Sequence, residues 1–212
     1  MQLPSIIFLS GMPGVGKSTL AHSILRNNLD YIIIEEVDII REALRAFINS
    51  NEKNINISNE NKNIINKASY EITYNEYINQ CKLLQPSIIG ICNRLQRKNI
   101  PVIIEGVNLD YISMFDNPKI SLNTFKNYIC INIHISNKKI YQSRLSKKYQ
   151  KYGAPNIDFW DEIIYRSEFC YCKLNNYILQ HPQYNIFNID LSSNICTPFN
   201  TKIIDYILDL FF

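Results

Sequence analysis

Short hydrophobic runs alternate along the chain with longer stretches of helical pattern. The runs are rich in Ile, show little polar alternation, and lie at about 5–9, 31–35, 101–105, 128–135 and 185–190. Strands of a parallel sheet have this pattern because helices cover both faces of the sheet. We therefore expect an α/β protein with five buried parallel strands.

The stretches between these runs predict the crossover helices. We expect helices over about 18–28, 39–47, 60–98, 137–150, 158–180 and 199–211. Residues 49–58 are rich in Asn and Ser and predict a surface loop. A length of 212 residues fits a single domain over 1–212.

Several classes of protein do not fit this sequence. The hydrophobic runs are far shorter than the roughly 18–20 residues of a membrane span, so we expect no membrane segment. We find no secretory signal at the N-terminus and no C-x-x-C pair among the six cysteines. We expect free thiols and a cytoplasmic location.

A phosphate-binding motif follows the first predicted strand. Gly11-Met-Pro-Gly-Val-Gly-Lys-Ser18 matches G-x-x-x-x-G-K-[ST] and leads into a predicted helix. Glycines let successive backbone N–H groups point at phosphate oxygens, and the helix N-terminus attracts the same anion. We expect Lys17 to bridge the β- and γ-phosphates and the Ser18 hydroxyl to bind Mg²⁺. The expected nucleotide contacts are Gly11, Met12, Pro13, Gly14, Val15, Gly16, Lys17, Ser18 and Thr19.

Two classes of phosphate-loop protein are disfavoured by missing motifs. A switch GTPase would carry N-K-x-D and D-x-x-G, but Asn61-Lys-Asn-Ile64 and Asn137-Lys-Lys-Ile140 lack the Asp, and D-x-x-G does not occur. A mechanical ATPase would have a strand ending in Asp-Glu, and Ile32-Ile-Ile-Glu-Glu36 lacks the Asp. A kinase remains as the favoured class.

Asp38 stands at the exit of the second predicted strand, with Arg41 and Arg45 on one face of the following helix. A carboxylate here can accept a hydroxyl proton or hold a Mg²⁺-bound water. An arginine one turn later can bind an anionic acceptor in bidentate fashion. The alternative is that Asp38 caps the helix and the arginines form a solvated face.

Glu105 ends the third predicted strand and is followed by Gly106. Open α/β sheets hold their ligands at this edge, and a buried charge is costly unless it faces the cleft. We expect Glu105 to contact the Mg²⁺ water shell or the acceptor hydroxyls, with Gly106 beside it. The alternative is a carboxylate that caps the next turn.

The mild net charge of +3 hides an uneven distribution. Residues 117–157 hold eight Lys or Arg and no acid, so the other 171 residues carry 14 positive and 19 negative charges. We expect a cationic lid at about 137–157 that closes over a triphosphate, with Arg144 near the transferring phosphoryl group and Arg166 at the acceptor. A solvated basic helix or a nucleic-acid patch are the alternatives. The histidines are isolated, and we assign them no role.

Four segments together resemble the 2-phosphoglycerate kinase family of small-molecule P-loop kinases. They are Ser10-Gly-Met-Pro-Gly-Val-Gly-Lys-Ser-Thr-Leu-Ala21, Asp38-Ile-Ile-Arg-Glu-Ala-Leu-Arg45, Ala68-Ser-Tyr-Glu71 and Val102-Ile-Ile-Glu-Gly-Val-Asn-Leu109. This resemblance covers about residues 1–110. It implies a sheet of order 2-3-1-4-5, a helical lid, and phosphorylation of a hydroxyl group on a small anionic acceptor. This chain departs from the family at Asn108, where a histidine is frequent, and at Ala68, where a serine is.

The favoured function is therefore a kinase that uses ATP and Mg²⁺ and phosphorylates a small acceptor. In this account Lys17, Asp38 and Arg144 are catalytic, and the acceptor-side helical region spans about 39–98. The first alternative is a nucleotide kinase or a polynucleotide 5′-hydroxyl kinase, in which the basic stretch follows a phosphate backbone. The second is a nucleotide-binding module without catalysis. The sequence leaves the oligomeric state open.

Overall fold

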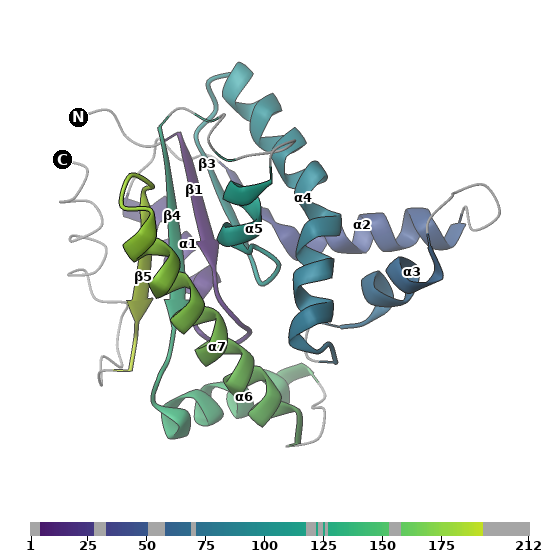
Figure 1. Ribbon diagram of the computed structural model, residues 1–212, viewed down its shortest axis with the longest axis vertical. Helices are drawn as coiled ribbons and strands as arrows, with labels where there is room; N and C mark the ends of the chain where they lie inside the picture. The colour runs from purple at the N-terminus through teal and green to yellow at the C-terminus, as the bar shows by residue number, and fades with distance from the viewer. Residues whose placement is uncertain are drawn as a thin grey trace.

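A five-stranded parallel sheet forms the centre of the computed structural model, which describes residues 5–27, 33–50, 58–68, 71–117, 122, 125, 127–152 and 158–192. The strands are β1 Ile6–Ser10, β2 Ile33–Glu36, β3 Val102–Gly106, β4 Tyr128–His134 and β5 Ile186–Asp190. Their order is β2-β3-β1-β4-β5, and each neighbouring pair is parallel (Figure 1). The predicted strands, their parallel pairing and the 2-3-1-4-5 order are confirmed.

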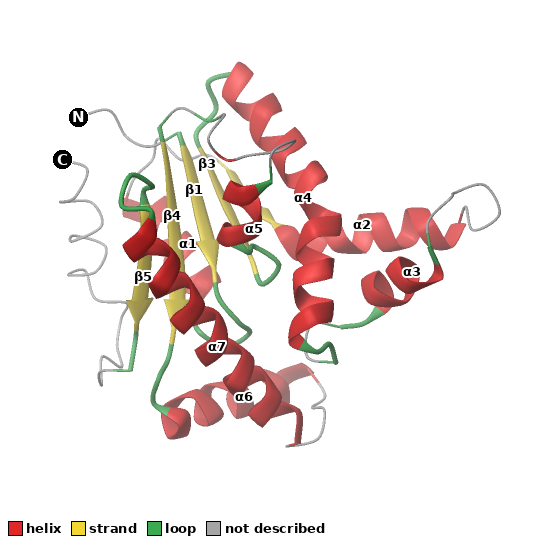
Figure 2. Cartoon of the chain, viewed as in Figure 1, coloured by secondary structure: helices red, strands yellow, loops and turns green. Residues whose placement is uncertain are grey.

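Helices cover both faces of this sheet (Figure 2). They are α1 Lys17–Asn27, α2 Val37–Ser50, α3 Asn59–Asn66, α4 Tyr74–Arg97, α5 Tyr111–Asp116, α6 Lys138–Tyr152 and α7 Asp158–Gln180. In Figure 1, α4, α5 and α7 lie in front of the sheet and α1 lies behind it. Crossovers between parallel strands are right-handed, so the direction of a connection across the sheet decides which face its helix covers. The β1 to β2 connection runs towards the β2 edge and the other connections run away from it, so α1 lies on the opposite face.

The predicted helix over 60–98 is wrong as a single element, because the chain breaks between α3 and α4. Thr73 caps α4 through a capping box in which its side chain accepts from the Glu76 N–H and the Glu76 carboxylate accepts from the Thr73 N–H. This box starts α4, whereas α3 has already ended at its C-cap residue Lys67. The short helix α5 was not predicted. The predicted helix over 199–211 and most of the predicted loop at 49–58 lie outside the described residues.

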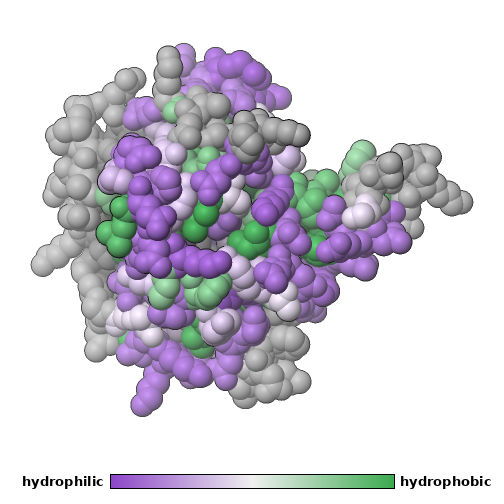
Figure 3. Space-filling model, in the orientation of Figure 1, coloured by the Kyte–Doolittle hydropathy of each residue, from purple (hydrophilic) through white to green (hydrophobic). Residues whose placement is uncertain are grey.

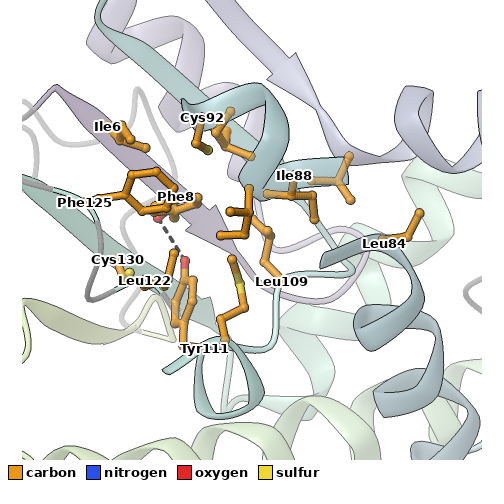
Figure 4. Close-up of a cluster of buried hydrophobic side chains, with 14 of the residues drawn as sticks. Ile6, Phe8, Leu84, Ile88, Cys92, Leu109, Tyr111, Leu122, Phe125 and Cys130 are labelled. Carbon is orange, nitrogen blue, oxygen red and sulfur yellow. Dashed lines mark hydrogen bonds between the residues drawn. The ribbon is translucent and has the colours of Figure 1, made fainter. Parts of the chain in front are cut away.

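Alternate residues of β1 contribute to two hydrophobic clusters, one on each face of the sheet. Ile7 and Leu9 pack with α1, whereas Ile6 and Phe8 pack with α4 and α5. Figure 4 shows the second cluster, in which the Tyr111 hydroxyl points at the strand and donates to the carbonyl oxygen of Phe8 at 2.9 Å. This bond joins α5 to β1 in the middle of the sheet.

The outer surface is mainly hydrophilic on the face shown in Figure 3, and hydrophobic residues gather where α2 and α3 join the body. Ile39 and Phe47 of α2 are among the exposed large hydrophobic side chains. Within the described residues, none of the helices combines the length and the apolar character that crossing a membrane demands.

Candidate functional site

The loop from Gly11 to Gly16 joins β1 to α1 at the carboxyl edge of the sheet. Gly11, Gly14 and Gly16 have φ angles of +140°, +83° and +108°, in the region that favours glycine. A side chain at Gly11 would also collide with the carbonyl oxygen of Ile133 in β4. The loop conformation therefore depends on these glycines, as the motif requires.

Lys17 is the first residue of α1, and its ammonium group is buried beside the loop. Its Nζ donates to the carbonyl oxygen of Met12 at 3.3 Å. The pKa of Lys17 is lowered to about 8, chiefly by burial and in part by the neighbouring Lys148 ammonium. Glu105 and Asp38 act in the opposite direction on this pKa. Two neighbouring cations in an environment of low dielectric constant favour the binding of an anion between them.

Helix α6 packs directly on the loop. The Arg144 guanidinium donates to the carbonyl oxygen of Val15 at 3.2 Å, and the Tyr141 hydroxyl donates to the carbonyl oxygen of Pro13 at 3.0 Å. No individual role was predicted for Tyr141 or Lys148 from the sequence. Lys148 could have been found, because it follows Arg144 by one helical turn, but no pattern marks Tyr141.

Glu105 is the penultimate residue of β3, opposite Leu9 of β1, and it is only 3% exposed. Burial raises the pKa of this carboxyl group, while a hydrogen bond from the Ser18 side chain and the Lys17 charge lower it. Its Oε2 atom is buried without a hydrogen-bond partner. Ser18 and Glu105, the two residues predicted to hold Mg²⁺ directly or through water, therefore lie together.

Arg41 lies on α2 and is 8% exposed. One of its terminal nitrogens is 3.5 Å from Asp38 Oδ1 and 3.5 Å from Glu42 Oε1, but Nε and the other terminal nitrogen have no hydrogen-bond partner. Asp38 is the second residue of this helix, and its side chain is 50% exposed. Asp38 and Arg41 lie together near the start of α2, and the Asp38 charge is close enough to Lys17 to raise its pKa.

Arg45 makes contacts of a different kind. Its guanidinium donates to the carbonyl oxygen of Ile65 in α3 at 3.2 and 3.3 Å and pairs with Glu42 at 2.9 Å. The two bonds to Ile65 join α2 to α3, whereas the pair with Glu42 lies within α2. Arg41, whose N–H groups are not all used, is therefore the better candidate for an acceptor contact, and an acceptor contact by Arg45 stays a prediction.

Arg166 of α7 is completely buried, with an exposed fraction of 0%. None of its three guanidinium nitrogens has a hydrogen-bond partner, and the group lies 6.0 Å from the centre of the Tyr77 ring. Burial lowers its pKa, while Tyr77 and Glu162 act to raise it. An unpaired buried charge is costly, so its retention points to a ligand that pairs with it.

Asn108 follows β3 and is 1% exposed. Its amide donates to Gln80 Oε1 at 2.7 Å, and the Gln80 amide donates to the carbonyl oxygen of Ile64 at 2.9 Å. The Oδ1 atom of Asn108 has no partner. This network, which the sequence analysis did not predict, joins α3 and α4 to the edge of the sheet.

A groove of about 910 Å³ lies between α4, α5 and α7, at some distance from the loop. Its walls include Tyr74, Asp110 and Lys173, and no residue of the phosphate-binding motif lines it.

The described part of the chain has no group of three or more His, Cys, Asp or Glu that could hold a metal ion. A Mg²⁺ site at the phosphate-binding loop would use a hydroxyl, phosphate oxygens and water.

Three solved structures resemble the chain over most of its length. A shikimate kinase from Acinetobacter baumannii in complex with shikimate is 13% identical, with a TM-score of 0.52 covering 99% of this chain and 95% of the other. A sugar kinase from Janibacter sp. HTCC2649 is 12% identical, with a TM-score of 0.51 covering 96% and 92%. A sulfotransferase domain from the curacin biosynthetic pathway is 14% identical, with a TM-score of 0.50 covering 100% and 75%.

These similarities show the fold alone, because the sequences have diverged so far. The five-stranded parallel sheet, its strand order and the helices around it are those of P-loop kinases. No protein-family model matches the sequence, and a search of curated proteins found no match.

Proposed function

We propose that the chain is a kinase that transfers the γ-phosphoryl group of ATP to a hydroxyl of a small anionic acceptor. The observation that carries the proposal is the pair of buried guanidiniums, Arg41 and Arg166, each with N–H groups that have no hydrogen-bond partner. Arg41 pairs with Asp38, whose charge acts on Lys17, and Arg166 is close enough to interact with Tyr141, which donates to the loop. Guanidinium N–H groups left unused in a low-dielectric environment favour the binding of an anion. A triphosphate on the loop and an anionic acceptor beside it would satisfy both sets of charges.

The nucleotide side would be held by the backbone of Gly11 to Gly16, Lys17, Thr19 and the cations of α6. Lys17 would neutralise the β- and γ-phosphates, and Arg144 and Lys148 would lie over the transferring group. The cationic segment 137–157 would act as the lid that excludes water during transfer. Ser18 would bind Mg²⁺ and Glu105 would bind its water, because the two side chains lie together and Glu105 Oε2 is unused. The metal ion would withdraw charge from the phosphoryl oxygens.

The acceptor side would lie between α2, the end of β3, and α7. Arg41 and Arg166 would bind the anionic group of the acceptor, and the free Oδ1 of Asn108 would accept from one of its hydroxyls. Asp38 would orient the reacting hydroxyl and take its proton, since it is close enough to Lys17 to affect its pKa. An acceptor like 2-phosphoglycerate, which carries a carboxylate and a phosphate, suits two separate guanidiniums.

An acceptor screen with γ-labelled ATP tests this proposal. The acceptors are 2- and 3-phosphoglycerate, nucleosides, nucleotides and a 5′-hydroxyl oligonucleotide, each with Mg²⁺. We expect labelled product with a small anionic hydroxy acid and none with the oligonucleotide. Labelling of the oligonucleotide or of a nucleotide would favour the polynucleotide or nucleotide kinase instead. Tight ATP binding without product from any acceptor would favour a binding module.

The Asp38→Asn variant separates catalysis from binding in the same screen. If Asp38 takes the hydroxyl proton, kcat falls by about 10²–10⁴-fold while the Kd for ATP changes little. The exposed Asp161, which pairs with Lys138 at the surface, supplies the matched control Asp161→Asn. Equal losses of kcat and ATP affinity in Asp38→Asn would reduce Asp38 to a structural role at the start of α2.

A further inference from the structure

Two side chains of α6 hold carbonyl groups of the phosphate-binding loop. In Figure 1, α6 lies at the end of the sheet to which the strand arrows point. The Tyr141 hydroxyl donates to the carbonyl oxygen of Pro13 at 3.0 Å, and Nη1 of Arg144 donates to the carbonyl oxygen of Val15 at 3.2 Å. Tyr141 is 0% exposed, so water does not compete for its hydroxyl group. Helix α6 therefore holds alternate peptide groups of the loop.

The bond at each carbonyl oxygen fixes the direction of the N–H group in the same peptide. The loop contains no cis peptide bond, and in a trans peptide the N–H group points away from the carbonyl oxygen. The Pro13 carbonyl shares its peptide with the Gly14 N–H, and the Val15 carbonyl shares its peptide with the Gly16 N–H. Each of these two N–H groups therefore points away from the α6 side chain that holds its carbonyl.

The other contacts of the loop leave the same two N–H groups available. The carbonyl oxygen of Met12 accepts from Lys17 Nζ at 3.3 Å, and the carbonyl oxygen of Gly16 accepts from the Leu20 N–H at 3.0 Å. Among the residues that the structure describes, neither Gly14 nor Gly16 donates its N–H to an acceptor of the protein. Neighbouring N–H groups without partners form a binding site for an anion.

Helix α6 also packs tightly against the loop. A Cβ atom on Gly14 would lie 3.1 Å from Cδ2 of Leu145 and 3.7 Å from the ring of Tyr141. Leu145, like Tyr141, is 0% exposed. The ring of Tyr141 therefore contributes to packing, whereas its hydroxyl group acts on the Pro13 carbonyl. Removing the hydroxyl alone should keep the packing and release the peptide between Pro13 and Gly14.

We propose that Tyr141 is a positioning residue, whose hydroxyl group holds the Pro13 carbonyl so that the Gly14 N–H is aimed at a bound phosphate. Arg144 does the same for the Gly16 N–H through the Val15 carbonyl. A donor at a carbonyl oxygen also polarises that peptide, which makes its N–H a stronger donor to an anion. N–H groups that are already oriented need no reorganisation when the phosphate binds. The triphosphate as ligand rests on the proposed function, whereas the orientation of the loop does not.

The first test needs no nucleotide. NMR of the ¹⁵N-labelled protein compares the Gly14 and Gly16 amide resonances of the wild type with those of Tyr141→Phe and Arg144→Met. Each variant removes the donor from one carbonyl. We expect the larger shift at Gly14 in Tyr141→Phe and at Gly16 in Arg144→Met. Any other pattern, including equal shifts of the two glycines in both variants, would overturn the proposal, because the side chains would then not act on separate peptides.

The second test measures the binding of inorganic tripolyphosphate and of ATP by calorimetry. Tripolyphosphate has no base or ribose, so its affinity depends on the phosphate contacts alone. The loss of one hydrogen bond predicts that Tyr141→Phe binds tripolyphosphate about 3- to 10-fold more weakly than the wild type. The same ratio is expected for ATP, because Tyr141 acts at the phosphates. If Tyr141 served packing only, Tyr141→Phe would keep the ring and bind both probes as the wild type does, which would overturn the proposal.

Tyr165→Phe is the matched control, because this α7 residue is 61% exposed. It should bind both probes as tightly as the wild type. If the two glycines respond as expected but the wild type binds neither tripolyphosphate nor ATP, α6 still orients the loop and the proposed kinase function fails. If ATP is bound and turned over equally by the wild type and Tyr141→Phe, the kinase function stands and Tyr141 is not a positioning residue.

Discussion

Gly106 and Val37 approach so closely that a Cβ atom on Gly106 would lie 2.5 Å from the Cβ of Val37. Val37 opens α2, one residue before Asp38, and Gly106 follows Glu105 at the end of β3. The absence of a side chain at Gly106 therefore sets how close the start of α2, which carries Asp38, lies to the strand that carries Glu105.

Gly106→Ala should displace the start of α2, because the branched side chain of Val37 leaves the new methyl group no space. We expect a loss of about 1–3 kcal/mol in the free energy of unfolding and a raised KM for the acceptor. The control is Gly90→Ala, since a Cβ there meets nothing within 4 Å and the residue lies inside α4. That variant should be more stable by roughly 0.5–1 kcal/mol. The double variant Gly106→Ala/Val37→Ala should recover stability if the loss comes from the contact between the new methyl group and Val37. Losses that add in the double variant would contradict this explanation.

Arg166→Met should stabilise the protein when no ligand is bound. Methionine keeps much of the volume of arginine and removes a buried charge without hydrogen-bond partners. We expect a gain of about 1–3 kcal/mol in denaturant unfolding, reduced by the loss of the contact with Tyr77. The same variant should lose acceptor-dependent transfer. Arg97→Met, at an exposed position in the last turn of α4, should stay within about 0.5 kcal/mol of the wild type. A destabilised Arg166→Met would show that the guanidinium is satisfied within the protein.

The lowered pKa of Lys17 predicts that the stability of the ligand-free protein depends on pH. Its pKa falls from 10.5 to about 8 on folding, so between these values the unfolded chain binds more protons and stability rises with pH. The cost of burying the charge is fully present below pH 8 and is removed as pH passes through this window, by up to about 3 kcal/mol. Lys17→Met should lack this rise, which urea unfolding from about pH 7 to 10 measures by difference. Equal slopes in the two proteins would mean that Lys17 is not desolvated.

The position of Glu105 beside Ser18 predicts that a neutral substitution weakens the binding of Mg²⁺. In Glu105→Gln the side chain keeps its shape but loses the charge that would hold a Mg²⁺-bound water. We expect the Mg²⁺ concentration for half-maximal activity to rise by about tenfold or more while the acceptor KM changes less. Glu71→Gln, at an exposed position before α4, serves as the control. A change confined to the acceptor KM would move Glu105 from the metal ion to the acceptor.

Local patterns in the sequence were enough to predict the parallel strands and the phosphate-binding loop, whereas the strand order was implied by the family resemblance. The strands appear as uninterrupted Ile-rich runs because both faces are buried, and the loop follows from glycines spaced before a lysine. The break before α4 also had a local signal, since Thr73 and Glu76 are spaced as a capping box. The helix α5 had none, because six residues are too few to show a helical period.

The contacts made by individual side chains at the site could not be predicted in this way. Arg41 and Arg45 share a helix face, but which of them keeps N–H groups available for a ligand depends on α3. The Ile65 carbonyl oxygen of α3 accepts hydrogen bonds from Arg45. The complete burial of Arg166 depends on how α7 packs against Tyr77. His134 was given no role because its partners, Ser167 and Glu168, lie 33 and 34 residues away in the sequence.

The most direct test of the central claim is transfer of the labelled γ-phosphoryl group from ATP to 2-phosphoglycerate or another small anionic hydroxy acid by wild type, Lys17→Ala and Lys139→Ala. Lys139 is an exposed residue of α6 and controls for the loss of one positive charge. We predict product with the wild type and Lys139→Ala, and at least about a 10²-fold loss in Lys17→Ala with the fold retained. Normal turnover by Lys17→Ala would contradict the account.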